Sequence, residues 1–312
     1  MLKLPDRPSS FQVWLILAIA VFAVSTAAIW VRLAVEATGR SSVGFSLFLA
    51  ASRLILAAIA LLPTWRSLAR TSAPKSAIVC AGAAGLCLAI HFATWITSLS
   101  FTSIAASTAL VTTNPIWVAL LGWLRFRERP TPTTCVGIAL ALAGGLCIAL
   151  GGGQTSSAPN PLLGDALALI GAWMASLYLL LGREAQRRGL GTGHYAAIAY
   201  SSAAAVLFPL PWLFGTGYSG YPTPVYLYLL LMALISQLLG HTSINWAVRW
   251  VSPTFVAIAI LFEPLGSSVL GFIIFGEVPG WLVAAGALVL LVGAAIALWG
   301  AAGERDRDRS QP

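Results

Sequence analysis

Long apolar segments alternate with short polar or charged clusters along nearly the whole chain. A helix that crosses a bilayer needs about 20 apolar residues, and segments of about this length predict ten membrane spans. The segments lack the alternating pattern of membrane β-strands, and a helix satisfies its own backbone hydrogen bonds in lipid, so we expect an all-α protein. The ten predicted spans are Phe11–Val31, Val43–Leu62, Ala77–Leu99, Ile104–Leu124, Cys135–Leu150, Leu162–Leu181, Tyr195–Phe214, Val225–Val248, Phe255–Phe275 and Val278–Trp299.

The composition favours a membrane protein over a water-soluble one. Of the 312 residues, 58% are hydrophobic and 9% are charged, and the mean hydropathy is +0.86. A soluble domain carries about 25% charged residues. The 4 cysteines all lie in apolar segments without CxxC spacing, which indicates small packing side chains rather than disulfides or metal ligands. We therefore expect neither a metal nor another cofactor.

Basic residues fall in alternate loops between the predicted spans. If the N-terminus is cytoplasmic, about fifteen Lys and Arg lie on that side and only Arg32 and Arg40 lie on the other. This bias predicts a multi-pass protein of the cell (inner or plasma) membrane with both termini in the cytoplasm. It also accounts for the net charge of +8, so we expect a lipid bilayer, and not nucleic acid, as the partner.

The chain resembles itself at an offset of 149 residues, and such self-similarity indicates a structural repeat. The offset aligns Asn114-Pro115 with Glu263-Pro264, Glu128 with Glu277, Gly137 with Gly286 and Gly144 with Gly293. The two repeats, 11–150 and 162–300, would hold five spans each. Because five is odd, the second repeat enters the membrane inverted, which is the architecture of secondary transporters.

The aligned residues also resemble a known family. The helix-end pattern Phe126-Arg-Glu-Arg-Pro followed by Gly137 and Gly144, and its partner Phe275-Gly-Glu-Val-Pro, resemble the EamA domain of the drug/metabolite transporter superfamily. The Gly164-Asp165-Ala166-Leu167-Ala168 segment, with Trp173 and Tyr178, resembles the opening of that family's second repeat, and Arg53 the basic residue of its second helix. The resemblance covers nearly the whole chain. It implies a ten-helix carrier of small metabolites, commonly an exporter.

Two prolines interrupt predicted spans at equivalent places in the two repeats. Pro115 follows Asn114, and Pro264 follows Glu263, each near mid-span. Proline removes a backbone donor and bends a helix, and paired interruptions indicate a binding site at the bilayer midplane. The alternative is that both prolines only shape helix packing.

Glu263 and Arg53 are charged residues deep within predicted spans. A carboxylate at mid-bilayer costs roughly 2.5 kcal/mol or more unless it is paired, hydrated or protonated. Glu263 is therefore a candidate for binding a proton or the substrate, and its protonation would couple transport to a proton gradient. Arg53 is suited to a substrate carboxylate or phosphate. The alternative for both is a structural ion pair.

Polar and aromatic side chains lie on matching helical faces in both repeats. Gln237, His241 and Asn245 are spaced four residues apart on the eighth span, and His91 and Trp95 have the same spacing on the third. With Tyr178, these residues are candidates to line a cavity, although a lone histidine is more often a packing residue. The paired glycines of the fifth and tenth spans indicate close packing between helices or between the protomers of a homodimer.

Together these features predict a secondary active transporter of a small organic metabolite that works by alternating access. With one intramembrane Arg, an amino acid or a drug-like solute fits better than a sugar phosphate. The alternatives are an intramembrane enzyme, for which the sequence shows no HExxH-like spacing, and a passive channel or scaffold, which would not explain the duplicated interruptions. Export and proton coupling are further hypotheses.

Overall fold

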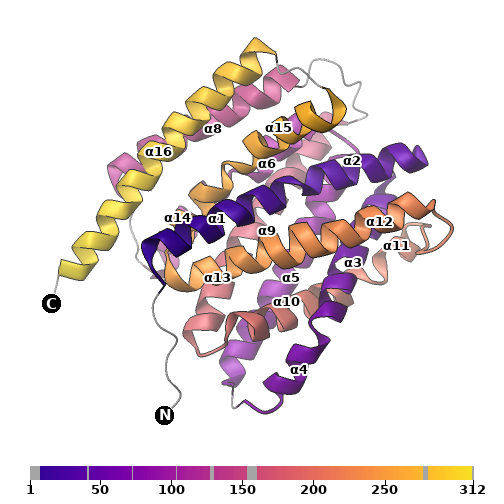
Figure 1. Ribbon diagram of the computed structural model, residues 1–312, viewed down its shortest axis with the longest axis horizontal. Coiled ribbons are helices and arrows are strands. Elements are labelled where there is room, and N and C mark those ends of the chain that lie inside the picture. The colour runs from indigo at the N-terminus through magenta and orange to yellow at the C-terminus, as the bar shows by residue number, and fades with distance from the viewer. Residues whose placement is uncertain are drawn as a thin grey trace.

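In the computed structural model the chain is built from helices (Figure 1). The structure describes residues 8–40, 42–71, 73–102, 104–126, 130–152, 160–276 and 280–310. The elements are α1 (Ser10–Ser25), α2 (Ala27–Thr38), α3 (Val43–Ala60), α4 (Leu62–Leu68), α5 (Lys75–Ser98), α6 (Ile104–Val111), α7 (Asn114–Phe126), α8 (Pro132–Gly152), α9 (Pro161–Arg187), α10 (Thr192–Leu207), α11 (Leu210–Leu213), α12 (Thr223–Leu231), the π-helix η1 (Met232–His241), α13 (Thr242–Trp250), α14 (Pro253–Ile260), α15 (Glu263–Phe275) and α16 (Trp281–Ser310).

Eight segments within the described residues are long and apolar enough to cross a membrane. They are Ser10–Thr38, Val43–Ala60, Lys75–Ser98, Pro161–Arg187, Thr192–Leu213, Thr223–Trp250, Pro253–Phe275 and Trp281–Gly300. Two further apolar helices, Asn114–Leu124 and Pro132–Cys147, are shorter. They fall in the fourth and fifth predicted spans, so the ten-span count remains a prediction.

The first helical segment is longer than its sequence pattern predicts. The charges at Arg32 and Glu36 indicate an end near Val31, but after a one-residue break at Thr26 the helical segment continues to Thr38. The Nε of Arg32 donates to Glu36 Oε1 at 2.9 Å, one turn further along. This i,i+4 pair supports the last turns of the helix.

Side-chain burial follows the contacts between the two halves of the chain. Helix α5 packs along α9 and α10, and α10 also packs on α3. Most of the largest fully buried side chains come from these helices, and they include Tyr195, Tyr200, Phe45 and Phe92. The core therefore forms where helices of the two halves meet, and not within each half alone.

Helices α8 and α16, the last of each half, pack against one another over much of their length (Figure 1). Their contact is made at glycines. A Cβ added to Gly144 would meet the carbonyl oxygen of Gly286 at 2.6 Å, and one added to Gly293 would meet that of Gly137 at 2.8 Å. Small residues let helix backbones approach this closely, which agrees with the packing between helices expected from the glycine spacing.

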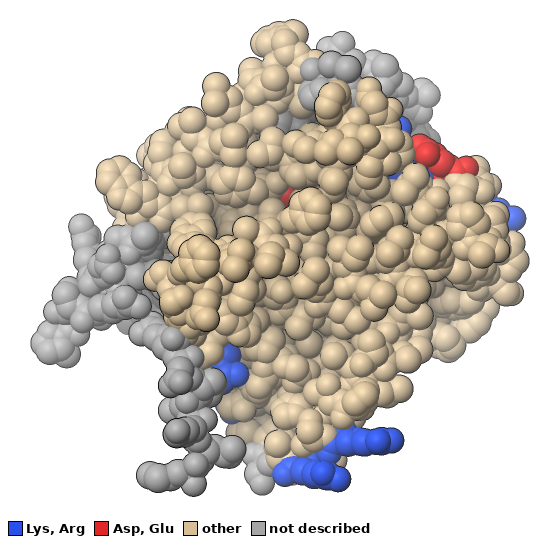
Figure 2. Space-filling view, viewed as in Figure 1, with Lys and Arg blue, Asp and Glu red and all other residues tan. Residues whose placement is uncertain are grey.

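Most of the molecular surface visible in Figure 2 carries neither acidic nor basic side chains. Large apolar side chains such as Leu162, Ile273 and Trp281 are mostly exposed. A contiguous apolar surface of this kind is unfavourable in water and suits contact with lipid.

Candidate functional site

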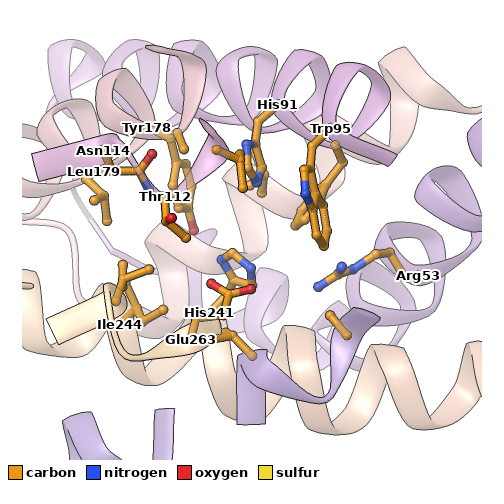
Figure 3. A pocket seen from close by; sticks show the side chains of 17 residues that line it. Arg53, His91, Trp95, Thr112, Asn114, Tyr178, Leu179, His241, Ile244 and Glu263 are labelled. Atoms are coloured by element: carbon orange, nitrogen blue, oxygen red, sulfur yellow. The ribbon is translucent and has the colours of Figure 1, made fainter. Parts of the chain in front are cut away.

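A pocket lies where helices of both halves converge, and we call it the central pocket (Figure 3). Its walls come from the α1–α2 junction, α3, α5 and the α6–α7 break in the first half. The second half contributes α9, the end of η1, the start of α13 and the α14–α15 break. The pocket is thus enclosed by the two parts of the chain together.

Two helix breaks shape the pocket at equivalent places in the two halves. Helix α7 begins at Asn114 after a break that follows α6, and α15 begins at Glu263 after a break that follows α14. Pro115 and Pro264 each stand second in the new helix, where the missing N–H and the fixed φ of proline are tolerated. Both breaks line the pocket, so they bring Asn114 and Glu263 to it.

Side chains from neighbouring helices hold the start of each new helix. Ser25 donates through Oγ to the carbonyl oxygen of Glu263 at 3.2 Å, and Ser267 donates to the carbonyl oxygen of Ser25 at 3.0 Å. In the other half, Ser176 Oγ donates to the carbonyl oxygen of Asn114 at 3.4 Å. The carbonyl oxygens of Asn114 and Glu263 thus each lie within hydrogen-bond distance of a serine hydroxyl on another helix, and the side chains of both residues line the pocket.

Arg53 is completely buried in the middle of α3 and lines the pocket. Its guanidinium carbon lies 4.1 Å from the ring centroid of Phe92 on α5, a cation–π contact. None of its three side-chain nitrogens has a hydrogen-bond partner among the described residues. An unpaired guanidinium in a bundle interior is costly, which makes Arg53 a candidate to bind a group that enters the pocket.

Glu263 lines the same pocket from the opposite half, with its carboxylate directed towards the space that also faces His241 and Arg53 (Figure 3). Among the described residues, the ion pairs within 4.0 Å do not include one between Glu263 and Arg53. The structural ion pair considered from the sequence is therefore not formed in this conformation.

Aromatic side chains of α5 form one wall of the pocket. The rings of His91 and Trp95 stack with an interplanar angle of 6° and centroids 6.1 Å apart. His91 Nδ1 donates to the carbonyl oxygen of Gly171 on α9 at 2.9 Å, so this histidine also joins two helices. Trp95 Nε1 is buried and has no hydrogen-bond partner in the described part of the chain.

His241 lies at the end of the π-helix, with its ring edge against two aromatic residues of the pocket. The centroid distances are 5.3 Å to Phe92 and 6.4 Å to Tyr178. Within the described ranges its Nδ1 has no hydrogen-bond partner, and the same holds for Asn114 Oδ1. The pocket thus gathers several buried polar atoms that the described protein does not satisfy.

The polar stripe predicted on the eighth span is divided between two environments. His241 lines the pocket, whereas the fully buried Gln237 and the buried Asn245 are not among its lining residues. An α-helical spacing places the three on one face. The π-helix closes i→i+5 hydrogen bonds and so has wider turns, which changes that face.

Asn245 instead belongs to a hydrogen-bonded group that we call the α9–α10–α13 cluster, formed by Gln186, Thr192, Tyr200, Thr242 and Asn245. Asn245 Nδ2 donates to the Tyr200 hydroxyl at 3.2 Å, and that hydroxyl shares a 3.1 Å hydrogen bond with Thr242 Oγ1. Gln186 Nε2 donates to the carbonyl oxygen of Asn245, and Thr192 Oγ1 donates to Gln186 Oε1, both at 2.8 Å. These bonds join three helices of the second half.

Sequence reasoning missed several residues that the structure places at these sites. Phe92 lies against Arg53 and His241, but an apolar residue in an apolar segment carries no signal of such a contact. Gln186 lies beyond the predicted end of its span, and Tyr200 has the appearance of a packing residue. Thr112 lines the pocket at the first helix break, and its nearness to Asn114-Pro115 was an available signal.

Some sequence predictions fall outside the part of the chain that the structure describes. Glu128 and Glu277, the acidic residues of the duplicated motif, both lie outside the described residues. Within the described ranges, no three His, Cys, Asp or Glu side chains come together in a way that could hold a metal ion.

Comparisons with known proteins place the chain among membrane transporters. An uncharacterized transporter of Archaeoglobus fulgidus is 22% identical over 287 residues, which cover 89% of this chain and 94% of that protein. The uncharacterized transporter YetK of Bacillus subtilis is 25% identical over 191 residues, covering 57% and 55% of the two chains. A solved crystal structure shares the fold with a TM-score of 0.73 at 19% identity, over 94% of this chain and 99% of the other.

The family match extends over both halves of the chain. Residues 12–150 and residues 162–299 each match the EamA-like transporter family. This membership and the transporter-named relatives indicate a multi-pass membrane transporter rather than an intramembrane enzyme. The resemblance noted in the sequence is thereby confirmed, and the chain belongs to the EamA-like transporter family.

Proposed function

We propose that this protein is a secondary active transporter that carries a small organic solute across the cell membrane by alternating access, with the central pocket as its binding site. The observation that supports this most strongly is the composition of the pocket. Both halves of the chain line it, each through a proline-associated helix break. It also collects buried polar atoms that have no partner in the described protein. A ligand would provide those partners.

The proposal includes a topology of ten spans in two inverted repeats. In it, α6 with α7 forms the fourth span and α8 forms the fifth, which completes five spans in each half. Both termini lie in the cytoplasm, as the loop charges suggest. Two states related by the symmetry of the repeats would then open the same pocket to each side in turn.

The proposed solute is an amino acid or a drug-like compound, and the proposed direction is export. Aromatic and aliphatic side chains make up most of the pocket walls, and Arg53 is the basic residue at the pocket with a fixed charge. A solute with one anionic group and an apolar body suits this lining better than a sugar phosphate, which would require several cationic side chains.

The proposal also includes coupling of transport to a proton gradient through Glu263. The carboxylate is one of two charged groups in a largely apolar pocket, so gain or loss of a proton there changes the net charge that the pocket presents. In alternating access, the side chain would take a proton from the water on one face and release it to the other.

Transport in reconstituted vesicles tests both secondary transport through the pocket and proton coupling through Glu263. A solute is first selected from a metabolite panel by its stabilisation of the detergent-solubilised protein. We expect a pH gradient to drive uptake of that solute by the unmodified protein, and Glu263→Gln to abolish the effect of the gradient while solute exchange without a gradient persists. Glu36→Gln, which alters an exposed acid outside the pocket, serves as the matched control.

Two outcomes would contradict the proposal at different levels. If Glu263→Gln responds to the gradient as the unmodified protein does, coupling through this residue is wrong, although transport itself stands. If the unmodified protein catalyses neither net uptake nor exchange of any stabilising solute, secondary transport through this pocket is wrong.

A further inference from the structure

The unsatisfied atoms of the central pocket differ in kind from one side to the other. The donors Arg53 Nε, Nη1 and Nη2 and the donor Trp95 Nε1 are all buried and unpaired among the described residues. In Figure 3 these two side chains lie beside each other at one side of the pocket, and Asn114, whose Oδ1 is an unpaired acceptor, lies at the other. A group that accepts several hydrogen bonds would therefore be well placed next to Arg53.

The charges of the pocket restrict what that group can be. The titratable side chains that line it are Arg53 on α3, His91 on α5, Tyr178 on α9, His241 on η1 and Glu263 on α15. Tyr200 on α10 is not among the lining residues and is hydrogen-bonded to Thr242. Of these, only Arg53 carries a fixed positive charge. When Glu263 is ionised the two charges sum to zero, and when it is protonated one positive charge remains.

An anion next to Arg53 is thus compatible with an electrically neutral pocket only when Glu263 holds a proton. With Glu263 ionised, an added carboxylate would give two negative charges against one positive charge in a medium of low dielectric, which is unfavourable. With Glu263 protonated, the anion and the guanidinium balance each other. Binding of an anion and binding of a proton therefore support one another.

The walls of the pocket indicate the body of such a ligand. Phe92 packs on Arg53 from one side, and the stacked rings of His91 and Trp95 continue the same wall along α5. Tyr178 on α9 lines the pocket beyond them. Flat aromatic surfaces of this kind favour offset or edge contacts with another flat ring.

We propose that the central pocket binds an organic monocarboxylate with a flat apolar body. The carboxylate of this ligand lies between Arg53 and Trp95, and one proton, bound to Glu263, is carried together with the ligand. This inference rests on the proposed function, because it takes the central pocket as the solute site. The loaded protein then crosses between its two states without net charge in the pocket. Transport is electroneutral, with one proton carried in the same direction as each anion, so export by this route is driven by the outward gradient of the solute and uptake by an inward proton gradient.

Four probes with one phenylpropyl skeleton test the charge that the pocket selects. They are 3-phenylpropanoate (an anion), 3-phenylpropanamide (neutral), 3-phenylpropylamine (a cation) and phenylalanine (a zwitterion). We expect isothermal titration of the detergent-solubilised protein at pH 7 to show 3-phenylpropanoate binding at least tenfold more tightly than the other three. Equal or tighter binding of any of those three, or no binding of the anion at millimolar concentration, would overturn the inference.

The accompanying proton is measured separately. Titration in two buffers with different ionisation enthalpies gives the number of protons taken up with each anion, and we expect a value approaching one in the pH range where Glu263 is ionised in the empty protein. Glu263→Gln, which mimics the protonated acid, should still bind 3-phenylpropanoate but without proton uptake. Proton uptake that survives in Glu263→Gln and is lost in His241→Gln would place the proton on the histidine and overturn this part.

Arginine variants separate loss of the site from loss of the fold. Arg53→Gln should lower the affinity for 3-phenylpropanoate at least thirtyfold, whereas Arg53→Lys should recover part of that affinity. Arg40→Gln removes the same side chain from an exposed position outside the pocket and should bind normally. Unchanged anion binding by Arg53→Gln would overturn the inference. The proposed function would still stand if vesicles containing the unmodified protein exchanged another solute.

Discussion

The central pocket and the α9–α10–α13 cluster both hold polar side chains inside an apolar bundle, yet their hydrogen bonding differs. In the cluster, Gln186, Tyr200 and Asn245 have partners on neighbouring helices. In the pocket, Arg53 and Trp95 keep unpaired donors among the described residues. Polar character alone therefore does not mark a binding site in such a bundle. The pocket differs from the cluster because several unpaired polar atoms converge on one space that a ligand can enter, whereas the polar groups of the cluster satisfy one another.

The largest difference between the two regions should follow from removal of Arg53. We expect Arg53→Gln to lower kcat/KM for the transported solute. The expected loss of transition-state stabilisation is about 2–5 kcal/mol, the range seen when one member of a buried charged contact is removed. The apparent melting temperature should stay the same or rise, since an uncompensated buried charge is lost. A fall of several degrees in melting temperature with unchanged kcat/KM would assign Arg53 to structure and contradict the comparison.

A smaller effect on binding, again without an effect on stability, is expected from Trp95→Phe. This change keeps a ring against His91 but removes the unpaired Nε1 donor. We expect the solute affinity to fall about tenfold, which corresponds to about 1.4 kcal/mol and is typical of one hydrogen bond. Parallel measurements of solute affinity and melting temperature check it. Unchanged affinity would mean that the indole N–H does not contact the solute.

A substitution in the α9–α10–α13 cluster should lower stability and leave solute binding unchanged. Asn245→Leu removes the donor to Tyr200, and we expect it to lower the free energy of unfolding by about 1 kcal/mol, as for other hydrogen bonds between membrane helices. KM for the solute should remain within twofold of the unmodified value. Equilibrium unfolding in detergent together with transport in vesicles measures both quantities. A large change in KM with normal stability would move Asn245 to the binding site.

The smallest expected effect is the interaction free energy between Asn245 and Tyr200 inside the α9–α10–α13 cluster. A double-mutant cycle of Asn245→Leu and Tyr200→Phe isolates the interaction between these two side chains. We expect a coupling free energy of about 0.6 kcal/mol in unfolding, and none in kcat/KM. Coupling in kcat/KM that exceeds the coupling in unfolding would show that the cluster takes part in transport.

The sequence pattern predicts the long helices well and their local irregularities poorly. The predicted Val43–Leu62 corresponds to Val43–Ala60, and the predicted Ala77–Leu99 to Lys75–Ser98. Hydropathy is sufficient there because a span must be apolar over a fixed length. It placed the end of the first helix too early because it treats a charge as a boundary, whereas Arg32 and Glu36 neutralise each other along one helix face.

The candidate site shows where single-sequence reasoning stops. Arg53, Glu263 and His241 are recognisable because charged or titratable groups are rare within spans, and all three line one pocket. Phe92 is not recognisable, since its role depends on which helix lies opposite. Asn245 and His241 share a predicted face, yet His241 lines the pocket and Asn245 is hydrogen-bonded to Tyr200. The π-helix from Met232 to His241 also alters the α-helical spacing that the prediction assumed between Gln237 and His241. A periodicity argument assumes one helix type throughout.

The glycine contact between α8 and α16 also limits how the molecule can move. Where Gly144 approaches the carbonyl oxygen of Gly286, main chain lies against main chain. A side chain can absorb a displacement by changing rotamer, but main-chain atoms in van der Waals contact cannot. In the proposed alternating access, α8 and α16 should therefore travel as a unit, and the displacements that open the pocket to one side or the other should be taken up by the remaining helices.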